Sequence, residues 1–237
     1  MQVFYSNNII NTAIFIEGQE HVHLTKVLRK SEGDEVAICN GSGLMLSARI
    51  VSISKKQTVL EKIEILAQEK VNTNKLILAV APTKNIDRYQ WMIEKCTEIG
   101  ISKIIPFYSK HSERRRLKLD RLQLIALSAM KQSKSLFLPE IIEPISFKDL
   151  LKMESVKQKG LAYMEEETTS IAKLISNLNR KEELLIAIGP EGGFSEEEVQ
   201  QAKTNGFAPT FIIGTSMSYP IVAIDYDLRF FAKGELI

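Results

Sequence analysis

Cysteine is scarce in this chain, with only Cys39 and Cys96 among 237 residues. The two stand far apart, which excludes a dense disulfide framework and a CxxC metal or redox motif. We therefore expect reduced thiols and a cytoplasmic location. The three histidines are His21, His23 and His111. His21 and His23 lie two apart on a predicted helix and so do not share a face, and we expect no metal site.

Long apolar runs and an excess of one charge are also missing. No run approaches the ~18 residues of a membrane-spanning helix. The start of the chain, MQVFYSNN, has neither the basic nor the apolar region of a signal peptide. The net charge is +2, so any affinity for nucleic acid has to come from local patches. The length suits one large or two small globular domains.

Phosphate-binding motifs of the GxGxxG and GxxxxGK[ST] types do not occur, yet a glycine loop is present in IAIGPEGGFSEEEVQQA, residues 186–202. The apolar run 184–188 before it predicts a buried strand. Ser195 and Glu198 form a capping box. We therefore expect a helix from Ser195 to about residue 205, with Gly206 just after its end.

The charges near this loop argue against a phosphate ligand. Glu191 and residues 196–198 place carboxylates at the start of the helix, where a phosphate would need positive potential. A neutral or cationic ligand fits better, and S-adenosylmethionine, which carries a sulfonium and no phosphate, is one. The alternative is a tight strand-to-helix connection with no ligand.

The first 70 residues are expected to be rich in β-strands. Apolar stretches alternate with turns such as NGSG and SKKQ, which is typical of hairpins in a small barrel or compact sheet. A short helix is predicted over residues 20–30, with Lys26, Arg29 and Lys30 near its end. These cations are explained either by the helix dipole or by contact with RNA phosphate.

From about Thr73 the pattern changes to alternating strands and helices, which predicts an α/β domain with a mainly parallel sheet. Strands are expected at 75–82, 103–107, 160–164, 183–188 and 209–214. Helices are expected at 87–100, capped by Asp87, and at 120–133, 170–178, 196–206 and 221–231. Ligands bind at the carboxyl ends of such strands. Three loops meet that condition: 164–169, 189–193 and 214–220.

Residues 108–121, YSKHSERRRLKLDR, form the densest basic cluster. Arg114, Arg115 and Arg116 are consecutive, in a chain whose net charge is only +2. We expect the cluster to contact nucleic acid or phosphate, and the alternative is a solvated surface. Tyr89 and Trp91 on the neighbouring predicted helix are explained by core packing.

Several segments together resemble one known family. IGPEGGFSEEEV, VLRKSEGDEVAICNGSG, APTKNIDRYQWMIEKCTEIGI and SERRRLKLDRLQLIALSAMKQS are similar to segments of the RsmE family. These proteins are 16S ribosomal RNA uridine N3-methyltransferases of the SPOUT superfamily. The resemblance extends over most of the chain and is far more specific than the glycine loop alone.

The resemblance implies an α/β fold with a small PUA-like RNA-binding barrel at 1–70 and a SPOUT methyltransferase domain with a trefoil knot at 73–237. It also implies a homodimer that binds S-adenosylmethionine and acts on 16S rRNA in the small ribosomal subunit. The residues expected at the cofactor are Gly189, Glu191, Gly192, Gly193, Ile213 and Gly214. Those expected to bind RNA are Lys26, Arg29, Lys30, Arg114, Arg115 and Arg116.

One segment departs from the family. Where the family carries Leu-Arg-Thr-Glu-Thr-Ala, this chain has Ser-Tyr-Pro-Ile-Val-Ala at 218–223, so only Ala223 agrees. Tyr219 stands at the arginine position and Ile221 at the glutamate position. The candidates for stabilising the uridine anion are Tyr219, Arg229, or an arginine of the 114–116 run from a partner subunit. The alternative function is a non-catalytic or weakly active RNA-binding relative, and a nucleotide-binding Rossmann enzyme is disfavoured by the acidic helix start.

Overall fold

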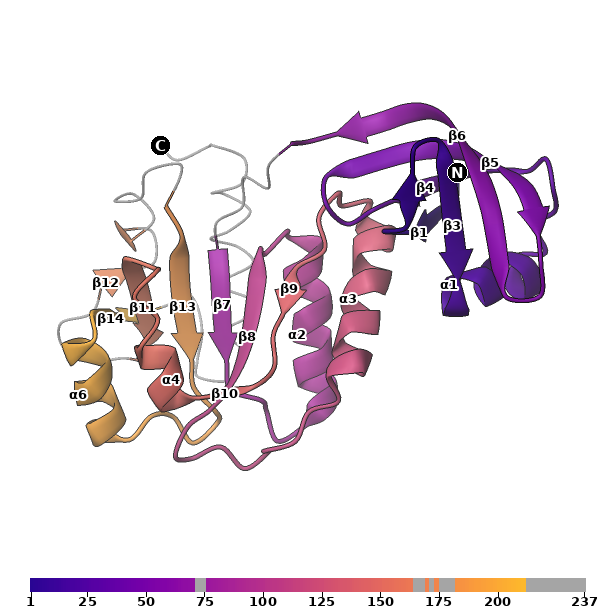
Figure 1. Cartoon of the computed structure of the whole chain (residues 1–237). Coiled ribbons are helices and arrows are strands. Elements are labelled where there is room, and N and C mark those ends of the chain that lie inside the picture. Colours follow the sequence, from indigo (N-terminus) through magenta and orange to yellow (C-terminus); the bar gives the residue numbers. More distant parts are fainter. Residues whose placement is uncertain (71–75, 164–168, 171–172, 175–181, 212–237) are drawn as a thin grey trace. The chain divides into compact units, whose positions relative to one another are not determined.

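The computed structural model describes residues 1–70, 76–163, 169–170, 173–174 and 182–211 (Figure 1). The chain divides into two compact units. The first combines Met1–Asn72 with Leu127–Leu138, and the second combines Thr73–Ala126 with Pro139–Ile237. We expected a single boundary between the domains near residues 70–73. That expectation did not include residues 127–138, which belong to the first unit.

The first unit is built on a six-stranded sheet, as the hairpin pattern predicted. Its order is β1-β4-β5-β6-β3-β2, and only the β1–β4 pair is parallel among the strands described. Apolar side chains such as Phe4, Ile38 and Leu60 are fully buried in its core. The strands are β1 (Val3–Tyr5), β2 (Ile9–Ile10), β3 (Ala13–Glu17), β4 (Glu35–Cys39), β5 (Leu44–Ile53) and β6 (Gln57–Gln68).

The helix expected at 20–30 is shorter and less regular. It consists of α1 (Gly18–Val22) followed by a π-helical turn, η1 (His23–Val27). The turn is widened because the Leu28 N–H donates to the carbonyl of His23, and the chain then leaves the helix at Arg29 with a left-handed φ of 50°.

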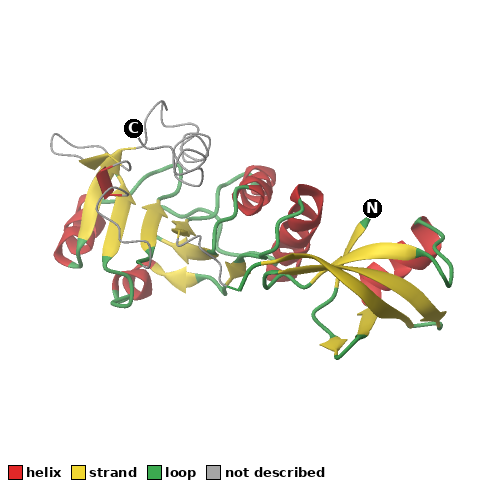
Figure 2. Ribbon diagram, turned by 90° about the horizontal axis from the view of Figure 1, so that it is seen from above, coloured by secondary structure: helices red, strands yellow, loops and turns green. Residues whose placement is uncertain are grey.

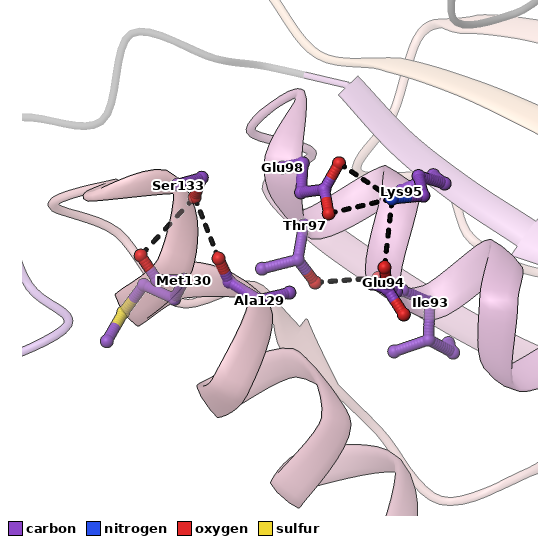
Figure 3. A network of polar contacts seen from close by, with 8 residues as sticks. All are labelled: Ile93, Glu94, Lys95, Thr97, Glu98, Ala129, Met130 and Ser133. Carbon is purple, nitrogen blue, oxygen red and sulfur yellow. Dashed lines mark hydrogen bonds and ion pairs between the residues drawn. The ribbon is translucent and has the colours of Figure 1, made fainter.

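Residues 127–138 join the first unit through the second half of helix α3 (Leu119–Ser133). Lys131 Nζ bonds one carboxylate oxygen of Glu20, and the other oxygen accepts the Tyr5 N–H at 2.9 Å. In the last turn of α3, Ser133 Oγ donates to the carbonyls of Ala129 and Met130 (Figure 3).

The second unit is an α/β domain with a parallel sheet, as predicted. Its order is β10-β8-β7-β13-β11-β14-β12, with β9 beside β8, and every strand pair described in it is parallel. β7 and β13 are buried along their whole length. The strands are β7 (Leu76–Val80), β8 (Lys103–Tyr108), β9 (Glu140–Ile141), β10 (Ile145–Ser146), β11 (Gln158–Ala162), β12 (Thr169–Ser170), β13 (Leu184–Ile188) and β14 (Phe207–Phe211).

Helices lie beside this sheet (Figure 2). Two of them, α4 (Phe147–Leu151) and α6 (Glu196–Thr204), share one core cluster with the sheet. Phe107, Phe147 and Phe194 gather in that core, with ring centroids 5.3–6.2 Å apart. This core supports the end of β13, from which the glycine loop leaves.

Helix α2 (Ile86–Glu98) corrects the predicted cap. The cap is Asn85 and not Asp87, because the Asn85 side chain accepts the Asp87 N–H at 2.9 Å. Within α2, Lys95 pairs with Glu94 and Glu98, both at 2.9 Å (Figure 3). Gly100 follows the helix with a left-handed φ of 86°, as expected of a stop signal.

The start of α6 agrees with its prediction. Ser195 Oγ accepts the Glu198 N–H, and the Glu198 carboxylate accepts the Ser195 N–H, so the capping box is complete. Gly206 follows with φ 82°.

The expected helix 221–231 and loop 214–220 lie outside the described residues, as do most of loop 164–169 and helix 170–178. The trefoil knot implied by the resemblance stays a prediction. Among the described residues, no helix has the length and apolar character needed to cross a membrane.

Candidate functional site

The candidate site lies where three loops leave the carboxyl ends of adjacent parallel strands. Along the sheet, β7 has β8 on one side and β13 on the other. From β7 the chain continues through α2 to β8 on one side, whereas from β13 it continues through α6 to β14 on the other side. Open α/β sheets bind ligands where the strand order reverses in this way. The loops are 81–85 after β7, 109–118 after β8 and 189–195 after β13.

The glycine loop is shaped by close contacts that leave little room for side chains at Gly189 and Gly192. A Cβ on Gly189 would lie 3.0 Å from the Phe194 ring, and one on Gly192 would lie 3.1 Å from the His111 Cβ. Gly193 has a left-handed φ of 68°, and its N–H donates to the Pro190 carbonyl at 2.8 Å. The loop therefore presents backbone to any ligand at this edge.

The chemistry around the loop suits a ligand without phosphate. Residues 189–198 contain no lysine or arginine. Glu191, Glu196 and Glu197 are exposed carboxylates beside the backbone of the loop. Carboxylates repel a phosphate at a helix start and tolerate a neutral or positively charged group. The residues present thus fit S-adenosylmethionine better than a nucleotide phosphate.

Two of the acidic residues also hold the loops together, which the sequence did not indicate. Glu191 accepts the backbone N–H of Lys84 at 2.9 Å. Glu198 is 9% exposed and accepts the N–H of Lys110 at 2.8 Å, in addition to its capping-box bond. The acidic helix start therefore joins the loops after β7, β8 and β13.

His111 is a further residue of the site that sequence reasoning missed. Its Nδ1 lies 3.1 Å from the Gly192 carbonyl oxygen and 3.3 Å from that of Gly193. Since both partners are acceptors, Nδ1 carries the hydrogen in this contact. The contact joins residues 81 apart in sequence, and no local pattern marks it.

The arginine run borders a hollow of about 780 Å³ in the second unit. Arg115, Arg116, Lys118 and Arg121 line it with exposed side chains. Of the described residues lining it, Glu143 is the only acid. The hollow therefore presents mainly positive charge.

The three consecutive arginines have different partners. Arg114 is half-buried and donates from Nε to the Thr83 carbonyl at 3.1 Å and from Nη2 to the Lys84 carbonyl at 2.8 Å. Arg115 donates to the Ser109 carbonyl at 3.3 Å. Arg116 is exposed, and within the described part of the chain it makes neither a hydrogen bond nor an ion pair.

Burial raises the pKa of the Tyr108 phenol, which lines the same hollow, and the nearby Arg115 partly opposes that rise. The phenol is therefore protonated at neutral pH and available as a hydrogen-bond donor to an anionic ligand.

The basic residues predicted in the first unit are near one another in sequence at the end of η1. Lys26 and Arg29 are exposed. Lys30 is half-buried, 3.9 Å from Asp34, and such a partly exposed pair contributes little stability. His21, expected at most to be partly buried, is 6% exposed and bonds Thr58 Oγ1 at 2.8 Å.

Four predicted site residues, Ile213, Gly214, Tyr219 and Arg229, lie outside the described residues. Within the described ranges, no group of three His, Cys, Asp or Glu residues is placed to hold a metal ion.

Two family models match the chain. The model described as an RNA methyltransferase domain matches residues 70–213, and the one described as an RNA methyltransferase PUA domain matches residues 16–63. The second match confirms the PUA-like character expected of the N-terminal barrel. Together they match part of each compact unit.

Curated relatives are similar over most of their length. Ribosomal RNA small subunit methyltransferase E of Bacillus subtilis (strain 168) is 31% identical over 234 residues, covering 90% of this chain and 89% of the relative. The protein of the same name from Mesomycoplasma hyopneumoniae (strain 232) is 34% identical, covering 78% of this chain and 79% of the relative.

Solved structures share the fold. The crystal structure of a probable rRNA-methyltransferase from Porphyromonas gingivalis is 29% identical with a TM-score of 0.83, covering 98% of each chain. That of a ribosomal RNA small subunit methyltransferase E from Neisseria gonorrhoeae bound to S-adenosyl methionine has a TM-score of 0.78 over 98% of each chain. At 22% identity, this second likeness supports the fold alone.

Proposed function

The chain belongs to the ribosomal RNA small subunit methyltransferase E family, and on that premise we propose that it methylates N3 of a uridine in 16S rRNA with S-adenosylmethionine. The observation that carries the proposal is the 31% identity to a relative of that name over 90% of the chain. The test is transfer of a labelled methyl group to small ribosomal subunits. Such a substrate agrees with a cytoplasmic location.

The cofactor would be held at the carboxyl ends of β7 and β13. We propose that Gly189, Gly192 and Gly193 present their backbone to it and that Glu191 lies beside it, with Ile213 and Gly214 completing the site. When bound, S-adenosylmethionine supplies a methyl group on a sulfonium, which is already an activated electrophile. The protein then has mainly to align the two reactants.

The protein also has to favour loss of the N3 proton of uridine. Its pKa is about two units above neutral pH, which corresponds to about 3 kcal/mol. A cation or hydrogen-bond donor beside the developing anion offsets this cost. The candidates are Tyr219, Arg229, or an arginine of the 114–116 run from a partner subunit.

We propose that RNA contacts the basic hollow and the cations Lys26, Arg29 and Lys30. The hollow has four exposed cations at one end of the sheet, next to the loops that form the candidate cofactor site. Phosphate contacts release counterions, so they are read directly from the dependence of affinity on salt.

Replacing Arg115 and Arg116 with alanine is expected to weaken binding to rRNA and to lower the slope of log affinity against log salt by about 2 units. Adding Arg114→Ala would bring the fall to 3 units only if Arg114 also contacts phosphate. The matched control is Lys148→Ala on α4 with Lys152→Ala at its C-cap, which removes the same charge from exposed positions. An unchanged slope in the arginine variant would make the run a solvated surface.

We further propose a homodimer, because residues 221–231 have the apolar content to cover a partner: Ile221, Val222, Ile224, Leu228 and Phe231. Sedimentation at micromolar concentration is expected to give twice the mass of 26.8 kDa. A monomer would count against any active site shared between subunits.

A second candidate function is RNA binding with little or no methyl transfer. The altered segment 218–222 favours it, because the arginine and glutamate of the family are absent there. The methylation assay separates the two functions, since both predict RNA binding and only the first predicts a methylated product.

A further inference from the structure

We infer that Arg114 is a positioning residue of the glycine loop, acting through Thr83, Lys84 and Glu191, and that it is not a phosphate ligand like its neighbours. This inference rests on the proposed function, because the loop it positions is the candidate cofactor site. All of these residues belong to the second unit.

The guanidinium of Arg114 holds two consecutive backbone carbonyls in a fixed arrangement. Arg114 uses Nε and Nη2 on the consecutive carbonyls of Thr83 and Lys84, at 3.1 and 2.8 Å. The planar fork of an arginine offers two donors in a fixed arrangement, whereas a lysine offers a single flexible point charge. With both carbonyls held, the direction of the intervening peptide, and so of the Lys84 N–H, is fixed.

The orientation of the Lys84 N–H affects the glycine loop through a hydrogen bond to Glu191. The Lys84 N–H donates to the Glu191 carboxylate at 2.9 Å, and Glu191 lies between Pro190 and Gly192. Thr83 Oγ1 also donates to the Asn85 carbonyl, and Asn85 caps α2. The 83–85 turn is therefore held by Arg114 on one side and by the start of α2 on the other. It contacts the glycine loop through the Glu191 carboxylate.

Arg114 and Arg116 differ in burial and in hydrogen bonding. Arg114 also borders the hollow, but it is half-buried, and the Nε–Nη2 edge of its guanidinium donates to two carbonyls. Arg116, two residues later, is exposed and has no hydrogen bond or ion pair with any described residue. A phosphate can bind Arg116 without breaking a contact to any described residue, whereas a bidentate phosphate contact through Nε and Nη2 of Arg114 would displace two carbonyls.

The ion pair beside this network does not replace it. Lys84 Nζ lies 3.0 Å from Glu113, and both side chains are well exposed, at 74% and 65%. Exposed pairs of this kind add little stability. Among the contacts described for this turn, Arg114 supplies the charged donor that holds both the Thr83 and the Lys84 carbonyl.

The experiment compares Arg114→Lys and Arg114→Ala with Arg116→Lys and Arg116→Ala. Binding of S-adenosylhomocysteine is measured by calorimetry, and the salt slope of rRNA binding by titration. Both Arg114 variants are expected to lose about tenfold in cofactor affinity, as for one or two lost hydrogen bonds from a charged donor, with the slope unchanged. Arg116→Ala is expected to keep the cofactor affinity and lose about 1 unit of slope.

Steady-state kinetics give a readout that general loss of structure would not. In Arg114→Lys, KM for the cofactor should rise about tenfold while kcat at saturating cofactor stays within about threefold, because ground-state and transition-state binding are weakened together. Thermal unfolding of each variant identifies any that fails to fold, and Arg114→Lys keeps the charge if Arg114→Ala does not fold.

Two results would overturn the inference: cofactor affinity within twofold of wild type in both Arg114 variants, or a fall of 1 unit in the salt slope for Arg114→Ala. Failure of the proposed function is distinguishable, because the wild-type protein itself would then show no cofactor binding.

Discussion

Gly192→Val is expected to abolish detectable binding of S-adenosylhomocysteine. A Cβ at this position would lie 3.1 Å from the His111 Cβ, so even the first atom of a side chain is tightly placed. The branched methyl groups of valine add to that conflict and also occupy the space beside the loop through which a ligand must approach its backbone. Calorimetry on wild type and variant measures the loss, for which at least a hundredfold is expected, about 2.7 kcal/mol.

A graded control separates the cofactor site from general damage. Gly192→Ala adds only the Cβ, which requires His111 to shift by no more than a few tenths of an ångström. Its loss of affinity should therefore be much smaller, and its melting temperature should stay close to that of wild type. Equal affinity in wild type and Gly192→Val would refute the placement of the cofactor at this loop.

Restoring the family's residues in the altered segment is expected to raise the rate of methyl transfer. If the family's arginine and glutamate stabilise the transition state, their absence slows transfer more than it weakens cofactor binding. Removing one such charged donor costs about 3 kcal/mol, roughly a hundredfold in rate. The wild-type protein should therefore be slow while keeping its affinity for S-adenosylhomocysteine.

The restoring variant combines Tyr219→Arg and Ile221→Glu, with and without Pro220→Thr. Proline fixes φ near −65° and removes an N–H, so the third change tests whether the backbone admits the family's geometry. Single-turnover rates on unmethylated small subunits are the measurement. A wild-type rate that is already fast and does not change in the variant would show that another group stabilises the uridine anion. Arg229 would then be the first residue to replace.

Local signals in the sequence predicted those parts of the fold that depend on neighbouring residues. The capping box of Ser195 and Glu198 fixed the start of α6 because both partners lie within one turn. The cap of α2 was misplaced for a related reason: Asn85 and Asp87 both have cap-forming side chains two residues apart, and only the structure shows which one accepts the N–H.

Contacts between distant residues were not predictable in the same way. Glu20 and Lys131 are 111 residues apart, and their pairing helps hold the second half of α3 in the first unit. His111 contacts the glycine loop only because the fold brings together residues 81 apart in sequence. The arginine run could be identified from composition. Only the structure shows that Arg114 bonds to backbone carbonyls, whereas Arg116 has no hydrogen bond or ion pair with any described residue.

The most direct test of the central claim is a single-turnover methylation assay. Small ribosomal subunits that lack N3-methyluridine are incubated with excess wild-type protein and methyl-labelled S-adenosylmethionine, and the labelled nucleoside is identified after digestion of the RNA. We expect slow incorporation that approaches one methyl group per subunit, all of it in N3-methyluridine of 16S rRNA. No label in 16S rRNA after prolonged incubation, or label in a different nucleoside, would contradict it.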